Sequence, residues 1–196
     1  YDDQGDIPKA IDYYNQSIAL NKEINDKAGL ASSFINLGVL YYDQNEKQLA
    51  LDFFQKSLDL RIEIGDKYGV SVSLNNLGGV YEDLGDSTKA LDYYTQSLKN
   101  AEESGQIDAM TLALNNIGFF YKNRGLYDEA LKYYNRMVEL KKQTGPDNSL
   151  ANTFTNIGSI YFLKGDYTKA YEYYNQALVL AKQVNSIRVI KGSAFS

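Results

Sequence analysis

Apolar residues recur along the chain with the spacing of one face of an α-helix. The first pattern places four of them at i, i+4, i+7 and i+11: Leu30, Phe34, Leu37 and Tyr41. A second pattern, over residues 10–24, carries apolar or small residues on two adjacent stripes, so we expect that helix to pack on two sides. Asn or Gly stands where each helix should end, which suits a left-handed C-terminal cap. The chain is therefore predicted to alternate between a first and a second kind of helix.

Both patterns return every forty residues without a gap. Ala occurs at positions 10, 50, 90, 130 and 170, and Gly at 38, 78, 118 and 158. An aromatic pair follows the same period, from Tyr13-Tyr14 to Tyr173-Tyr174. Such a period is typical of solenoids built from helical hairpins. We predict a partial repeat at 1–25 that begins with the end of a first helix, full repeats at 26–65, 66–105, 106–145 and 146–185, and the start of a further helix or a linker at 186–196.

The residues of these columns resemble the tetratricopeptide repeat pattern. The matching positions include Asn76-Leu77-Gly78, Tyr81, Gly85-Asp86, Ala90 and their counterparts around Gly158. The resemblance covers the whole chain, but Phe or Leu replaces the familiar Trp, and the period exceeds the usual value of about 34. This longer form is similar to arrays of kinesin light chains, of Pins-type polarity adaptors and of bacterial signalling proteins. The resemblance implies an all-α fold: one right-handed α-solenoid of antiparallel helical hairpins over residues 1–196.

Composition argues against most enzyme classes. The chain contains neither Cys nor His, which removes thiol chemistry, the usual general base and the commonest metal ligand. Neither a G-x-G nor a P-loop sequence is present. We therefore expect no catalytic residue, no metal and no cofactor. The net charge of −5 also argues against nucleic acid and against direct membrane contact. Tyr1 suggests a piece of a longer protein, whose compartment stays open, with a cytoplasmic one favoured.

The first helix of each repeat is expected to line the concave side of the array. At about 100° per residue, a set of mainly Asn residues falls opposite the core side of these helices. An Asn amide offers both a donor and an acceptor, so it can pair with a peptide backbone whatever the peptide's sequence. For Asn36, Asn76, Asn116 and Asn156 a structural interpretation, hydrogen bonding to the adjacent repeat, stays equally open. The predicted partner-binding residues are Asn36, Asn75, Asn76, Asn115, Asn116, Phe119, Asn123, Asn152 and Asn156.

These residues favour a protein-interaction scaffold that binds a peptide or partner protein in a concave groove. The expected ligand is neutral or basic, because Asp43 and Asp83 are the groove's charges and Lys122 is placed only at its rim. The alternative is a regulatory or sensor segment of a larger signalling protein, such as a histidine kinase or a cyclase. A passive spacer, with end-to-end self-association, is a third hypothesis.

Overall fold

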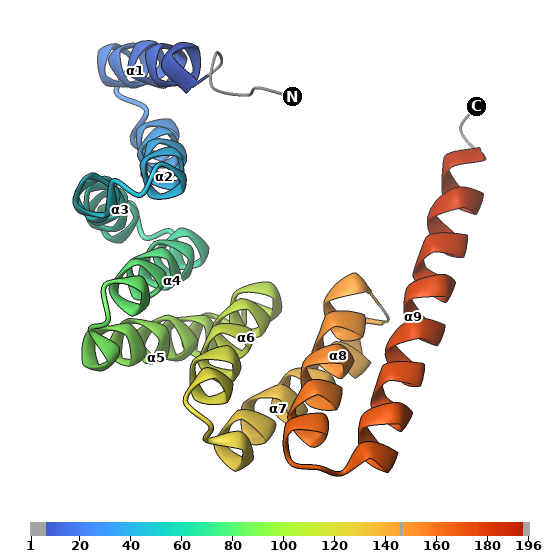
Figure 1. Ribbon diagram of the computed structural model, residues 1–196. Helices are drawn as coiled ribbons and strands as arrows, with labels where there is room; N and C mark the ends of the chain where they lie inside the picture. The colour runs from blue at the N-terminus through green and yellow to red at the C-terminus, as the bar shows by residue number, and fades with distance from the viewer. Residues whose placement is uncertain (1–6, 146, 194–196) are drawn as a thin grey trace. The chain divides into compact units, whose positions relative to one another are not determined.

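The computed structural model describes residues 7–145 and 147–193, and within them the chain is helical and has no strand (Figure 1). The first-helix tail expected at residues 1–5 lies outside the described part. The chain forms two compact units, Tyr1–Ala109 and Met110–Ser196. The nine described helices are α1 (Ile7–Glu23), α2 (Lys27–Asp43), α3 (Lys47–Glu63), α4 (Lys67–Asp83), α5 (Ser87–Ser104), α6 (Ile107–Asn123), α7 (Tyr127–Thr144), α8 (Asn148–Leu163) and α9 (Tyr167–Ser193).

The ends of the helices follow the local sequence. The structure confirms the expected C-terminal caps of α1 to α8. One or two positions past the end of each of these helices stands a residue with a positive φ: Asn25, Asn45, Gly65, Gly85, Gly105, Gly125, Gly145 and Gly165. Several helices begin at an Asp whose carboxylate accepts a hydrogen bond from the backbone N–H three residues on, as Asp66 does from Gly69. Local sequence thus sets where α1 to α8 stop and where several helices start, although α3 and α7 begin without a side-chain cap.

The last helix departs from the prediction. We expected it to end near Asn185, but α9 continues as one helix to Ser193. Asn185 replaces the Gly that ends α3, α5 and α7, and Ser186 replaces the Asp that caps α2 and α4. An Asn can remain inside a helix at a lower cost in stability than Gly. The stop signal at this position is therefore weaker than at Gly65, Gly105 and Gly145. Asn25 ends α1 at the same position of the repeat, but there an Asp follows it and caps the next helix.

Within each hairpin the two helices approach closely at a glycine. A Cβ atom added to Gly78 of α4 would lie 2.6 Å from the ring of Tyr94 in α5. The same contact recurs at Gly38 with Phe54, at Gly118 with Tyr134 and at Gly158 with Tyr174. The alanine column lies beside it, and Ala90 is fully buried. Only a residue without a side chain fits at this contact, which explains why Gly recurs at this position of the repeat.

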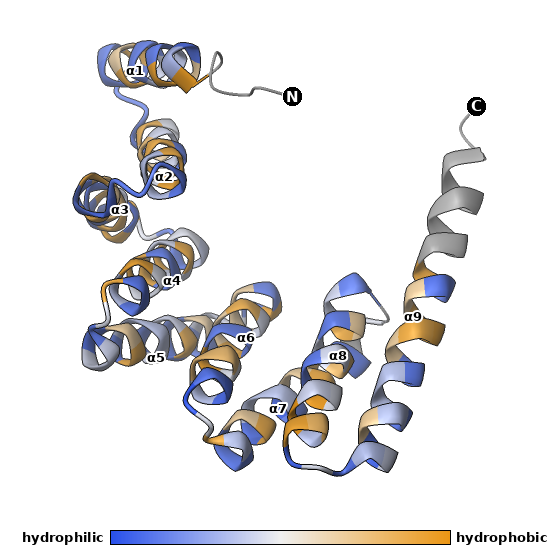
Figure 2. Cartoon of the chain, in the orientation of Figure 1, coloured by the Kyte–Doolittle hydropathy of each residue, from blue (hydrophilic) through white to orange (hydrophobic). Residues whose placement is uncertain are grey.

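Small or polar side chains join successive hairpins. The residues lie sixteen positions apart, one on a second helix and one on the first helix that follows. In Figure 2 hydrophobic and hydrophilic residues are interspersed along the coloured part of the helices. The contacts are Ser17 with Ser33 at 2.9 Å, Ser73 donating to Ser57 at 3.3 Å, and Thr153 donating to the sulfur of Met137 at 3.3 Å.

The tyrosine hydroxyl groups that contact the Gly positions have different surroundings in the two units. The Tyr94 hydroxyl donates to Glu82 Oε2 at 3.1 Å. The Tyr134 hydroxyl is buried and has no hydrogen-bond partner in the described part of the chain. Phe54 holds the equivalent position in the first hairpin and needs no partner. Glu82 corresponds, forty residues on, to Lys122, which cannot accept a hydrogen bond.

We predict that Gly78→Ala lowers the unfolding free energy by about 1–3 kcal/mol, because the new methyl group overlaps the Tyr94 ring. The adjacent Gly79 is the matched control. Its added Cβ would meet no atom closer than the Tyr94 hydroxyl at 3.7 Å. Gly79→Ala should therefore be neutral or stabilise the protein by up to about 1 kcal/mol. Urea denaturation measures both, and equal effects would contradict the packing described.

Tyr134→Phe should stabilise the protein by about 1 kcal/mol, because it removes a buried hydroxyl that has no partner. Tyr94→Phe should have the opposite sign, because Glu82 loses its hydrogen bond. Thermal unfolding of the two variants is the measurement. A loss of stability in Tyr134→Phe equal to that in Tyr94→Phe would show that the Tyr134 hydroxyl is satisfied.

The stability of the first unit should fall in acid. Burial opposes ionisation of Asp66, but the Gly69 N–H bond and Arg61 outweigh it and hold the pKa of this carboxyl below its ordinary 3.8. A lowered folded-state pKa stabilises the fold above the unfolded value, and that contribution is lost as the pH falls through the folded value. Asp66→Asn keeps an acceptor for the cap without the charge. It should reduce stability at pH 7 and lessen the loss below pH 3.8, as read from denaturation at several pH values.

Candidate functional site

In the first unit, α2 and α4 present a shared surface with a pocket of about 230 Å³. Asn36 is exposed on this surface, as predicted for a binding residue, and lines the pocket. Asn76 of α4 is half-buried. We call this surface, Asn36 and Asn76 together with the pocket, the α2–α4 face. The pocket is lined by Ser32, Ile35 and Asn36 of α2, Arg61 of α3, and Tyr68 and Val72 of α4.

Arg61 is a residue of this pocket that sequence reasoning missed, because only first helices were assigned to the groove. Its guanidinium pairs with Asp66 and donates from Nη2 to Ser32 Oγ at 2.8 Å. A Cβ on Gly69 would lie 2.4 Å from Arg61 Cδ, so the missing side chain of this glycine makes room for the arginine. The pocket therefore contains a cation, but one that Asp66 already compensates.

Carboxylates lie at the C-terminal ends of α2 and α4. Asp43 and Asp83 are both exposed. Asp83 accepts a hydrogen bond from the Tyr42 hydroxyl at 2.5 Å, and its backbone oxygen accepts one from Lys47 Nζ at 2.9 Å. Burial, followed by the bond to Asp83, raises the pKa of Tyr42 to about 12, so this hydroxyl stays a donor at neutral pH. This end of the α2–α4 face carries negative charge.

Asn75 does not occupy the accessible position that we expected. Its side chain is 3% exposed, and its Nδ2 donates to Ser97 Oγ at 2.6 Å and to the Ser71 carbonyl at 3.1 Å. It belongs to the contact between α4 and α5, and the expectation for this residue is corrected accordingly. One residue further on, Asn76 lies about 100° around the helix and escapes that contact.

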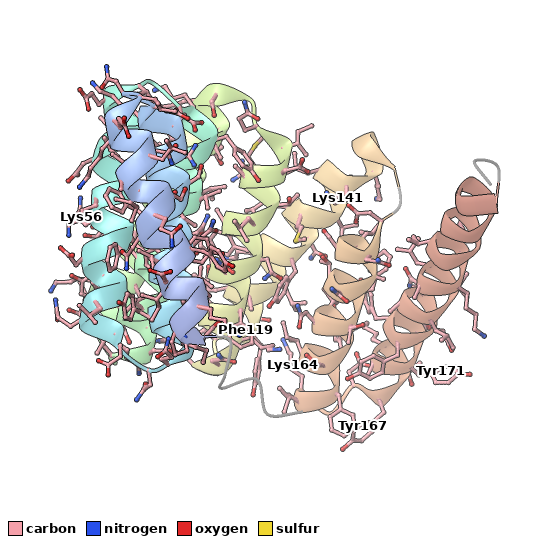
Figure 3. The ribbon with its side chains drawn as sticks, turned by 90° about the horizontal axis from the view of Figure 1, so that it is seen from above. Lys56, Phe119, Lys141, Lys164, Tyr167 and Tyr171 are labelled. Atoms are coloured by element: carbon pink, nitrogen blue, oxygen red, sulfur yellow. The ribbon has the colours of Figure 1, made fainter. Side chains whose placement is uncertain are left out.

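In the second unit, α6 and α8 present the corresponding surface. Asn123 and Asn152 are exposed, and the other predicted amides are half-buried. Phe119 is 44% exposed (Figure 3). We call this surface the α6–α8 face. Its residues are Asn115, Asn116, Phe119, Lys122, Asn123, Asn152 and Asn156.

Lys122 lies within this face and not at its rim, which corrects the prediction. Its Nζ donates to Asn156 Oδ1 at 3.3 Å and lies 5.1 Å from the centroid of the Phe119 ring. Helix geometry contained the signal for this position. Lys122 falls about 140° around the helix from Ile117, a buried core residue, and so on the outward half. The ammonium group thus joins the two helices of the α6–α8 face.

The described residues offer no other chemistry at either face. No group of three or more carboxylates that could hold a metal occurs among them. Nor is any described helix long and apolar enough to cross a membrane. What the two faces provide is amide hydrogen bonding beside apolar contacts, with carboxylates in the first unit and one lysine in the second.

Solved structures of other repeat arrays are similar to this chain in fold. BtubC from P. vanneervenii shares 23% identity at a TM-score of 0.79, over 93% of this chain and 76% of BtubC. A kinesin-light-chain-like protein of Podosopora anserina with nearly identical TPR-like repeats shares 14% identity at a TM-score of 0.67, over 92% and 89% of the two chains. A Rap protein complexed with competence and sporulation factor shares 20% identity at a TM-score of 0.78, over 93% of this chain but 51% of the Rap chain.

The sequence itself points to one family. No curated protein sequence matches this chain significantly. The family model of the tetratricopeptide repeat matches residues 1–63, 48–103 and 109–183, which together span most of the chain. The forty-residue period, the helical hairpins and the Gly–aromatic contacts agree with that match. The chain belongs to the tetratricopeptide repeat family.

Proposed function

We propose that this chain is a non-catalytic scaffold that binds peptide segments of partner proteins, one on its α2–α4 face and one on its α6–α8 face. The observation that carries the proposal is the recurrence of accessible or half-buried Asn side chains on the first helices of both units. Membership of the tetratricopeptide family supports it. The similar Rap protein, solved in complex with a factor, is an array of this fold that holds a ligand.

The chemistry of the Asn amides suits an extended segment. Asn36 and Asn76 can each give and accept a hydrogen bond with a peptide backbone, which does not depend on the peptide's side chains. Ile35 and Val72 in the pocket can then contact apolar side chains. A net contribution of about 0.5–1.5 kcal/mol for each bond means that several Asn residues must act together for micromolar affinity.

Charge favours a neutral or basic segment at the α2–α4 face. Asp43 and Asp83 are exposed there, and the cation of the pocket, Arg61, is already paired with Asp66. An acidic segment would meet repulsion from these two carboxylates without a new ion pair in return. The regulatory alternative, in which an array of this kind couples its ligand to a fused signalling domain, stays a separate hypothesis.

Self-association through the terminal helices is a secondary proposal. Large apolar side chains are exposed on α1, including Tyr13 and Leu20. The same holds on α9, including Tyr167 and Tyr171 (Figure 3). Tyr171 is 69% exposed, whereas Leu51 at the equivalent position of α3 is buried. Apolar surface of this kind favours contact with another helix. Sedimentation at increasing concentration tests whether the chain associates.

We predict that replacing Asn76 and Asn116 together by Ala weakens peptide binding at either face at least about tenfold, because each Asn gives and accepts a backbone bond and both bonds are lost. The probe is the best binder from a displayed library of short random peptides, measured by calorimetry as a synthetic peptide. Circular dichroism should show unchanged helical content.

Asn75→Ala is the control for this experiment. It removes the bonds to Ser97 and Ser71 and should therefore lower the melting temperature. Its effect on the affinity for the peptide should be smaller than that of the double variant. If the double variant unfolds while Asn75→Ala only loses the peptide, the Asn column is structural and the proposal is wrong.

A further inference from the structure

Lys122 differs from the other lysines whose contacts the structure describes. Most of these form an ion pair with a carboxylate, for example Lys27 with Glu63 at 2.6 Å and Lys132 with Glu129 at 2.6 Å. Within the described residues, Lys122 contacts only the Asn156 amide oxygen and the Phe119 ring through its charge. The α6–α8 face thus holds a cation for which this part of the chain supplies no counter-charge.

The surroundings of Lys122 make that situation unfavourable without a ligand. The residue is half-buried, and burial lowers the pKa of its ammonium group. Removal of water from a charge is offset when an opposite charge takes its place. An ammonium group has three donors, of which Asn156 uses one, so two remain for an incoming acceptor.

The other repeats show what Lys122 replaces. The equivalent positions hold Tyr42, Glu82 and Phe162. In the first unit Glu82 accepts the hydrogen bond of the Tyr94 hydroxyl. Forty residues on, Lys122 replaces Glu82 and Tyr134 replaces Tyr94, and the Tyr134 hydroxyl has no partner among the described residues. The buried Tyr134 hydroxyl therefore lacks an acceptor in the repeat in which the lysine replaces the glutamate. A loss of packing quality of this kind is typical of a position that serves binding.

We infer that Lys122 receives the carboxylate of an acidic side chain, Asp or Glu, from the peptide segment that binds the α6–α8 face. Asn156 and the Phe119 ring hold the ammonium group in place, and the exposed Phe119 contacts the methylene groups of the same acidic residue. Asn152, one turn before Asn156 on α8, is exposed and can bond the peptide backbone beside it. This inference rests on the proposed function and adds that the two units prefer opposite charges.

The charge preference is tested by selecting peptides on the wild type and on Lys122→Glu. The library displays short random peptides with both ends embedded in the display protein, so that no terminal carboxylate is present. The wild type should enrich Asp and Glu, and Lys122→Glu should instead enrich Lys and Arg. Lys122→Glu also restores the acceptor that Glu82 gives to Tyr94, so its melting temperature should not fall. The same charge composition in both selections would overturn the inference.

A direct measurement uses two synthetic end-blocked peptides that differ only by Glu or Gln at the enriched position. The wild type should bind the Glu peptide at least about fivefold more tightly, because a charge-assisted bond replaces a neutral one. The difference should shrink as the salt concentration rises. It should vanish in Lys122→Gln and persist in the control Lys132→Gln, whose lysine is exposed and already paired with Glu129.

The outcomes separate this inference from the proposed function. Equal affinity of the wild type for the Glu and Gln peptides would refute the role of Lys122 and leave peptide binding standing. Failure to select any binder on the wild type would refute the proposed function itself. A preference for a Gln peptide with a free C-terminus over the end-blocked Glu peptide would show that the lysine receives a terminal carboxylate, which contradicts the side-chain assignment.

Discussion

The close contact between a glycine of the first helix and an aromatic ring of the second is the constraint on which the hairpins depend. At Gly78 even one added carbon atom would lie 2.6 Å from the Tyr94 ring. This distance sets how near the two helices can approach, and it requires the same residue types at the same positions in every repeat. The contact does not restrict the residues on the side of the first helix that faces away from its partner, and these residues differ between repeats.

Two adjacent residues show how the direction of a side chain separates packing from the outward surface. Asn75 and Asn76 have the same chemistry, but Asn75 is held by Ser71 and Ser97 at the contact between α4 and α5. A buried amide needs these partners, because an unsatisfied donor would destabilise the fold by about 1–3 kcal/mol. Asn76 leaves the helix about 100° further around its axis, away from that contact, and is half-buried. The buried amide joins helices, and we assign recognition to its neighbour.

Lys122 and Tyr134 illustrate how stability and recognition compete at one position. Glu82 satisfies the Tyr94 hydroxyl in the first unit, and the substitution of a lysine at the equivalent position of the second unit leaves Tyr134 without an acceptor. In exchange, the α6–α8 face gains a cation beside an aromatic ring. The two units thus share one architecture and differ in charge, with Asp43 and Asp83 on one face and Lys122 on the other.

The sequence by itself determined the helices, their caps and the repeat, because these depend on short-range spacing and on the conformations that Gly and Asn allow. Of the eight Asn residues that it placed on the outward side of the first helices, three are exposed, four are half-buried and Asn75 is buried. The tertiary structure decided what long or amphipathic side chains do: Arg61 reaches from α3 into the α2–α4 pocket, and Lys122 reaches across to Asn156. Helix periodicity gives the direction in which a side chain leaves the backbone. It does not give its reach or the neighbour that it meets, since both depend on how the helices pack.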